Sequence, residues 1–104
     1  MTPEEALSGS IAEIAPQLEK RKLSPVALAE ASLRKLESVG RSLNAVANLM
    51  RERALEEAKA AEREIAAGRY RGPLHGVPYG AKDVLAAKGA PTSWGVGPLA
   101  DQTL

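Results

Sequence analysis

Apolar residues recur every three or four positions in several stretches of the chain, and this spacing predicts helices. The clearest stretch is residues 51–67, where one apolar stripe is surrounded by charged side chains and is followed by Gly68. The stripe consists of Ala54, Leu55, Ala58, Ala61 and Ile65. The pattern predicts an amphipathic helix with a solvated outer face, ending at the glycine.

A second stripe follows Ser24 and Pro25, residue types that favour the N-cap and first turn of a helix. It consists of Val26, Ala29, Leu33, Leu36 and Val39. Gly40 then stands where a left-handed residue would end the helix. Upstream, Ser10 predicts the start of another helix, in which Pro16 removes one backbone donor and predicts a kink or a tightened turn.

The remaining segments are shorter and less regular. Residues 43–49 carry no charge, and we interpret them as a short strand. Residues 69–104 contain six glycines and four prolines, a composition that excludes a long helix. There the sequence predicts loops around one short strand at 77–83, followed by a helical or extended piece at 84–87.

Composition and charge restrict the class of protein. Of the residues, 44% are hydrophobic, but 19 of these are alanine and none is phenylalanine, so the core is expected to be thin. A net charge of +1 gives no electrostatic basis for binding nucleic acid or an anionic membrane. The chain has no cysteine and one histidine, which excludes disulfides, thiolate catalysis and a multi-histidine metal site. No long apolar segment or secretory signal is present, so we expect a cytoplasmic protein without membrane contact.

Lys82 is the candidate for chemistry. In a strand at 77–83, alternation places Lys82 on one face with Pro78 and Gly80, which leaves space above it. The glycine–lysine spacing does not fit a phosphate-binding loop, and Asp83 occupies the position of its Ser or Thr. A lysine in apolar surroundings is neutral more often and can accept a proton from a serine hydroxyl. The alternative is a solvated lysine beside a solvated aspartate, and both interpretations remain open on the residues alone.

Three ring side chains have simpler interpretations. His75 is expected to be a loop residue that hydrogen-bonds locally. Trp94 is expected to anchor packing, and Tyr79, on the face opposite Lys82, is expected in the core.

Residues 76–83, Gly-Val-Pro-Tyr-Gly-Ala-Lys-Asp, resemble the Gly-x-Pro-x-x-x-Lys-Asp element of the amidase signature family. The similarity covers nearly the whole chain. It includes Leu-Ser-Pro-Val at 23–26, Leu-Asn-Ala at 43–45, the alanine-rich helix up to Gly68, Gly-Pro-Leu-His-Gly at 72–76 and Lys-Gly-Ala-Pro-Thr-Ser at 88–93. The ordered set of elements is much more specific than the octapeptide alone.

The resemblance implies an α/β fold, a large mixed sheet flanked by helices on both faces. Residues 1–104 would form the N-terminal helices and first strands of this single domain, whose remainder is absent from the chain. It also implies hydrolysis of carbon–nitrogen (amide) bonds of a small-molecule substrate by a Ser–Ser–Lys triad, with Lys82 as the catalytic lysine and no metal or organic cofactor. None of the seven serines matches the triad positions, so we expect the chain alone to be inactive.

Two alternatives remain. One is the A subunit of a tRNA-dependent amidotransferase, but such subunits commonly have Asn after Lys-Asp and a Thr-Thr-Cys downstream. Here Val84 follows Asp83 and Trp94 follows Ser93, which favours a stand-alone amidase. The other is a non-catalytic helical module whose stripe, Leu55, Ala58 and Ile65, docks on a partner or on a second copy in a homo-oligomer.

Overall fold

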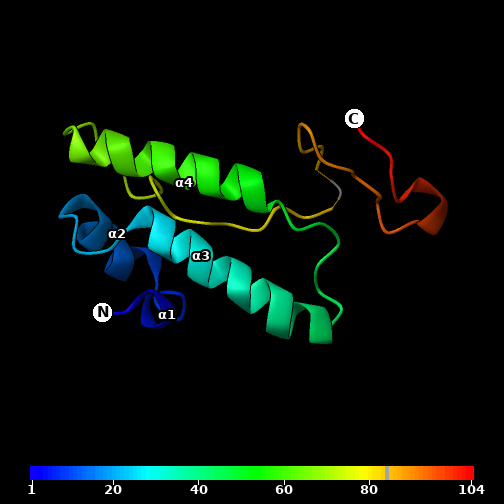
Figure 1. The fold of residues 1–104 in the computed structure, drawn as a ribbon, viewed down its shortest axis with the longest axis horizontal. Coiled ribbons are helices and arrows are strands. Elements are labelled where there is room, and N and C mark those ends of the chain that lie inside the picture. Colours follow the sequence, from blue (N-terminus) through cyan, green and yellow to red (C-terminus); the bar gives the residue numbers. More distant parts are fainter. Residues whose placement is uncertain (84) are drawn as a thin grey trace.

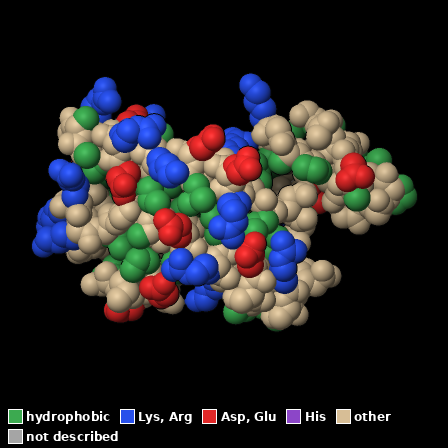
Figure 2. All heavy atoms as spheres, in the orientation of Figure 1, with side chains coloured by type: hydrophobic (Ala, Val, Ile, Leu, Met, Phe, Trp, Pro, Cys, Tyr) green, Lys and Arg blue, Asp and Glu red, His purple; other side chains and the backbone are tan. Residues whose placement is uncertain are grey.

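The computed structural model describes residues 1–83 and 85–104, and within them the fold is helical (Figure 1). The elements are α1 (Pro3–Ala6), α2 (Ile11–Glu19), α3 (Pro25–Lys35), a π-helical turn η1 (Leu36–Gly40), α4 (Arg51–Ala66) and a short 3-10 turn η2 (Gly97–Leu99). Helices α3 and α4 lie side by side and run in opposite directions, while α1 and α2 lie near the start of α3. Charged side chains of both signs are interspersed over the visible face, in keeping with the small net charge (Figure 2).

Helices α2 and α3 begin at the predicted caps, Ser10 and Ser24. The Ser24 hydroxyl oxygen accepts a hydrogen bond from the Ala27 N–H at 3.1 Å. Ser10 and Glu13 form a reciprocal capping box at the start of α2. Pro16 lies inside α2 and does not end it. Side-chain oxygens therefore satisfy backbone donors that would otherwise have no partner at these helix starts.

The end of α4 also follows the prediction. Gly68 has φ +82°, and its N–H donates to the Ile65 carbonyl at 3.0 Å. The Arg69 N–H donates to the Glu64 carbonyl at 2.8 Å. This pair of bonds is the Schellman motif, which uses a left-handed residue to turn the chain away from the helix axis.

The prediction of a left-handed stop at Gly40 is wrong. The left-handed residue is Asn44, with φ +54°, and the Ala45 N–H donates back to the Gly40 carbonyl at 2.8 Å. Gly40 itself is buried, and a Cβ there would lie 2.9 Å from Cγ2 of Val46. This glycine is therefore required for the close approach of the returning chain rather than for a special φ.

The core has two parts. The first joins α1, α2 and α3 through Ala6, Ile14, Leu18, Leu23 and Leu28, with the half-buried Leu7 and Val77 packed against it. In the second, α3 and α4 pack through mostly small side chains, and the buried ones are Ala29, Leu33, Ala58, Ala61 and Ile65. Many are alanines, as the thin core predicted, so the two helix backbones approach closely.

The apolar stripes of α4 and of residues 25–40 are not exposed and buried as predicted. Ala58 and Ile65, which the interaction-module alternative needed to be free, are buried within the chain. Leu36 and Val39, expected on the buried stripe, are 39% and 48% exposed, because only the first part of the 25–40 stretch faces α4.

Neither predicted strand forms among the described residues. Residues 43–49 are turn and irregular chain, and so are residues 77–83. The single bridge in the described part of the chain pairs Pro91 with Thr103. A strand needs a neighbour to complete its hydrogen-bond ladder, and no described segment lies beside either stretch in that role. Of the piece expected at 84–87, Val84 lies outside the described residues and the rest is irregular.

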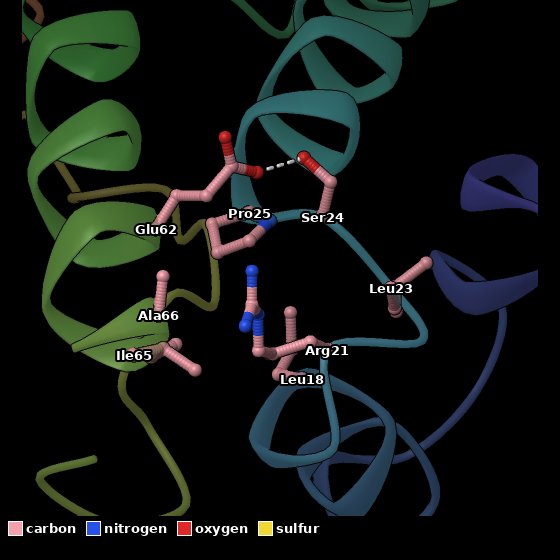
Figure 3. Close-up of a pocket in the computed structure, with 8 residues that line it drawn as sticks. All are labelled: Leu18, Arg21, Leu23, Ser24, Pro25, Glu62, Ile65 and Ala66. Carbon is pink, nitrogen blue, oxygen red and sulfur yellow. Dashed lines mark hydrogen bonds between the residues drawn. The ribbon is translucent and has the colours of Figure 1, made fainter. Parts of the chain in front are cut away.

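The end of α2 has a strained residue that the sequence pattern did not indicate. Arg21 has φ +62°, and the Lys22 N–H donates to the Gln17 carbonyl at 2.8 Å, so Arg21 occupies the left-handed position of a Schellman motif. Figure 3 shows its side chain beside a small pocket of about 150 Å³ between α2, α3 and α4. The Ser24 hydroxyl donates to the Glu62 carboxylate across the same pocket.

Replacing Arg21 by glycine should stabilise the chain by up to about 1 kcal/mol, because glycine adopts this conformation without a steric cost. Thermal or urea unfolding of the 104-residue chain measures the change. The matched control is Lys22→Gly at the next position, where φ is not positive and glycine should be neutral or destabilising. Equal effects of the two substitutions would contradict a strained Arg21.

Candidate active site

Residues 72–83, which we call the lysine segment, cross the two parts of the core after α4 ends. The chain turns twice at the start of the segment, through hydrogen bonds from His75 N–H to the Gly72 carbonyl (3.0 Å) and from Val77 N–H to the Leu74 carbonyl (3.2 Å). Val77 then packs against the core formed by α1, α2 and α3. The sequence motif is thus attached to the helices at its N-terminal half.

Gly76 lies close to the start of α3 and the end of α4. It has φ +88°, and a Cβ on it would lie 3.0 Å from Cγ of Pro25 and 3.7 Å from Cδ1 of Ile65. Both the conformation and the space therefore require glycine. This contact places the segment against the first residue of α3 and the last turn of α4.

His75 holds the first turn, and the prediction of a locally hydrogen-bonded loop residue is confirmed. Its Nδ1 accepts the Arg71 N–H at 3.0 Å, and its Nε2 lies 3.3 Å from Oε1 of Glu64. The Arg71 guanidinium donates to the same Glu64 oxygen at 2.9 Å. The ring also stacks on Tyr70, with centroids 6.0 Å apart, and the side chain is 5% exposed. The imidazole thus joins α4 to the motif and is largely buried.

The second half of the lysine segment is more open than predicted. Tyr79 is 85% exposed, so its expected place in the core is wrong for this chain. The side chain of Lys82 is exposed too, and among the described residues it forms no ion pair. Without a strand, the predicted alternation of faces is not established. The apolar surroundings expected around Lys82 are therefore not supplied by the described residues.

A groove of about 790 Å³ runs beside the lysine segment. Its walls are α3, α4, residues 48–50 and residues 71–81, and Lys82 follows directly after the last lining residue. Its volume is in the range of small-molecule sites. The sequence did not indicate this groove, since its walls come from segments far apart along the chain.

Asp83 links the end of the lysine segment to residues 90–93. One carboxylate oxygen accepts the Ser93 N–H at 3.0 Å and the other accepts the Ser93 hydroxyl. These hydrogen bonds, the hydroxyl bond foremost, hold the pKa of the Asp83 carboxyl below its ordinary value.

Trp94 is 49% exposed, with φ +57°, so the expectation that it anchors packing is wrong for this chain.

Within residues 1–83 and 85–104, no cluster of three or more His, Cys, Asp or Glu side chains has the arrangement of a metal site. In the same part of the chain, no helix combines the length and apolarity needed to span a membrane.

The lysine motif lies within a stretch of sequence that matches a known protein family. The model of the family described as Amidase matches residues 27–103, and the chain belongs to this family. The resemblance seen in the sequence is thereby confirmed.

Individual relatives divide into two kinds. The chain is 39% identical over 92 residues to an acylamidase of Rhodococcus erythropolis, covering 88% of this chain and 19% of that protein. It is 40% identical over 93 residues to the putative amidase AmiD of Mycobacterium tuberculosis, covering 88% and 20%. It is 41% identical over 95 residues to the A subunit of the glutamyl-tRNA(Gln) amidotransferase of Aromatoleum aromaticum, covering 91% and 19%. The chain spans about a fifth of the length of these relatives. No solved structure matches it significantly.

Replacing Gly76 by alanine should destabilise the chain more than replacing Gly68 by alanine. Both glycines have similar positive φ values, so the backbone strain is shared, but only Gly76 has Pro25 in the way of a Cβ. We expect about 1–3 kcal/mol beyond the cost at Gly68, because the neighbouring side chains must shift. Urea unfolding of both variants tests the contact, and equal losses would show that Gly76 does not lie on Pro25.

Proposed function

We propose that this chain is part of a hydrolase of carbon–nitrogen bonds in which Lys82 is the base of a Ser–Ser–Lys triad. The observation that carries the proposal is the position of Lys82. It stands in the Lys-Asp element of the matched family region, immediately beyond the groove, with its ammonium group unpaired among the described residues. An amine in that position is available to a partner group outside these 104 residues.

The proposed chemistry needs neutral Lys82. Its Nζ accepts a proton from a bridging serine, which in turn accepts the proton of the nucleophilic serine as that oxygen attacks the amide carbonyl carbon. The tetrahedral intermediate collapses as the carbon–nitrogen bond breaks, and the leaving nitrogen takes the proton back through the same relay. Water, deprotonated along the same path, then attacks the acyl-serine ester. The ester bond breaks, the serine oxygen takes the proton back through the relay, and the acid is released. Protons and electron pairs balance without a metal or organic cofactor.

The proposed fold explains how Lys82 would become neutral. We infer that residues 77–83 join a large mixed sheet flanked by helices on both faces, and that this chain forms the N-terminal part of that domain. Pairing with a neighbouring strand would cover the exposed Lys82 and remove water from its ammonium group. Desolvation disfavours the charged form of a lysine and so increases the fraction able to accept a proton.

The relatives indicate a class of substrate and not a particular compound. The acylamidase and the amidase support a small-molecule amide, and we propose such a substrate. The amidotransferase subunits support a second candidate, hydrolysis of the glutamine amide within an amidotransferase. Valine at position 84 favours the first. If the complete protein released ammonia from glutamine only in the presence of charged tRNA, the amidotransferase function would be correct.

In the complete protein, Lys82→Ala should lower kcat for amide hydrolysis at least about a thousandfold, as removal of a triad member does. Lys82→Arg should be equally inactive, since a guanidinium does not give up its proton near neutrality. The matched control is Lys88→Ala, another exposed lysine on the neighbouring loop, which should keep normal turnover.

Near-normal turnover of Lys82→Ala would contradict the assignment. The 104-residue chain by itself should not hydrolyse amides, because none of its serines stands in the triad positions. Turnover by this chain that is blocked by a serine-directed inhibitor would also contradict the proposal.

A further inference from the structure

Asp83 is adjacent to the proposed base but has no part in the proton relay. Its carboxylate binds both the N–H and the hydroxyl of Ser93, ten residues along the chain. The Ser93 hydroxyl oxygen also accepts the Gly95 N–H at 3.2 Å, so this serine is held on both sides. We call the two hydrogen bonds between Asp83 and Ser93 the clip.

Ser93 belongs to an anchored part of the structure. Its neighbour Thr92 is 1% exposed and exchanges two hydrogen bonds with Gln102, from Thr92 N–H to the Gln102 carbonyl (2.6 Å) and from Gln102 Nε2 to the Thr92 carbonyl (3.0 Å). The clip therefore attaches Asp83 to a short antiparallel pairing rather than to a free loop end.

Two side chains near the start of α4 bind the chain just before Ser93, one from the loop that precedes the helix and one from the helix itself. Asn48 Nδ2 donates to the Pro91 carbonyl at 3.1 Å, and Arg53 Nη1, on α4, donates to the Lys88 carbonyl at 2.9 Å. The position of Ser93 is thus set relative to α4 through bonds that do not involve the lysine segment.

Lys82 is consequently held from both directions. On its N-terminal side, Gly76 and Val77 lie on the helices, and on its C-terminal side Asp83, one Cα–Cα step of about 3.8 Å away, is fixed by the clip. Without the clip, the backbone between Val77 and Lys88 would have no side-chain hydrogen bond among the described residues.

We propose that Asp83 is a positioning residue: its clip to Ser93 fixes the backbone of Lys82, and with it the point in space from which the amine reaches its serine. This inference rests on the proposed function, since it assigns to Asp83 the orientation of that base. A base displaced by about 1 Å can lose about a hundredfold in rate while the substrate still binds.

The protonation of Asp83 gives the clip a pH dependence of known sign. Because the hydrogen bonds lower the pKa of this carboxyl, the clip contributes fully above the ordinary aspartate range and is lost as the pH falls through the lowered value. The charged side chains close to Asp83 in sequence are Lys82 and Lys88. Asp101 precedes Gln102, the partner of Thr92, and Arg53 of α4 donates to the Lys88 carbonyl.

The existence of the clip is tested in the 104-residue chain by NMR. The Ser93 amide proton shift should titrate with a carboxyl whose midpoint lies below that of an ordinary aspartate. Ser93→Ala, which removes the hydroxyl donor, should raise the midpoint of Asp83, and Asp83→Asn should abolish the titration. The control Asp101→Asn should change neither. A Ser93 amide that does not titrate, or that still titrates in Asp83→Asn, would overturn the clip.

Its role is tested in the complete protein with an amide substrate. Asp83→Asn should lower kcat about 10- to 100-fold with KM nearly unchanged, and Ser93→Ala should have a smaller effect in the same direction. Ser93→Thr, which keeps the hydroxyl, should restore most of kcat, and Asp101→Asn should leave it unchanged. Normal kcat in Asp83→Asn would overturn the positioning role. Full activity of Lys82→Ala would instead reject the proposed base, whatever the NMR result.

Discussion

The close approach of Gly76 to Pro25 is the contact that fixes the path of residues 72–83, and the arrangement of the candidate site depends on it. Pro25 begins α3 and Ile65 is near the end of α4, so one glycine without a side chain touches the point where the two long helices meet. The small residues between these helices allow their backbones to approach, and the lysine segment crosses the place where they do so. A larger residue at 76 would lift the segment away from the helices and change the course of the chain towards Lys82.

The chain holds the backbone of the lysine and leaves its side chain in water. The helices, His75 and the Asp83–Ser93 clip fix residues 72–83 at several points, whereas Lys82 and Tyr79 are exposed. Positioning and desolvation are separate requirements of a lysine base. In our proposal, residues of this chain meet the first requirement and the neighbouring strands of the sheet meet the second. The exposed Leu74 and Tyr79 beside the groove support the proposal that further strands cover this surface.

Features set by nearby residues were predictable from the sequence. The caps at Ser10 and Ser24, the buried stripe of α4 and its end at Gly68 each depend on a few neighbouring positions. Gly40 is required because Val46 packs against it after the chain turns back at Asn44. A glycine in a sequence does not show whether a positive φ or a close packing contact requires it. The predicted strands at 43–49 and 77–83 do not form, because a strand needs hydrogen-bond partners from another segment of chain. Lys82 was found through its motif, but the groove and the clip join positions whose proximity no local pattern encodes.

The role proposed for Lys82 depends most directly on where its amine lies in the complete protein. A crystal structure of that protein, with its nucleophilic serine trapped by a phosphonate, would show it. We predict that Nζ lies about 3 Å from the hydroxyl of a second serine, out of contact with bulk water. An Nζ that points into solvent, with no serine hydroxyl within reach, would contradict it.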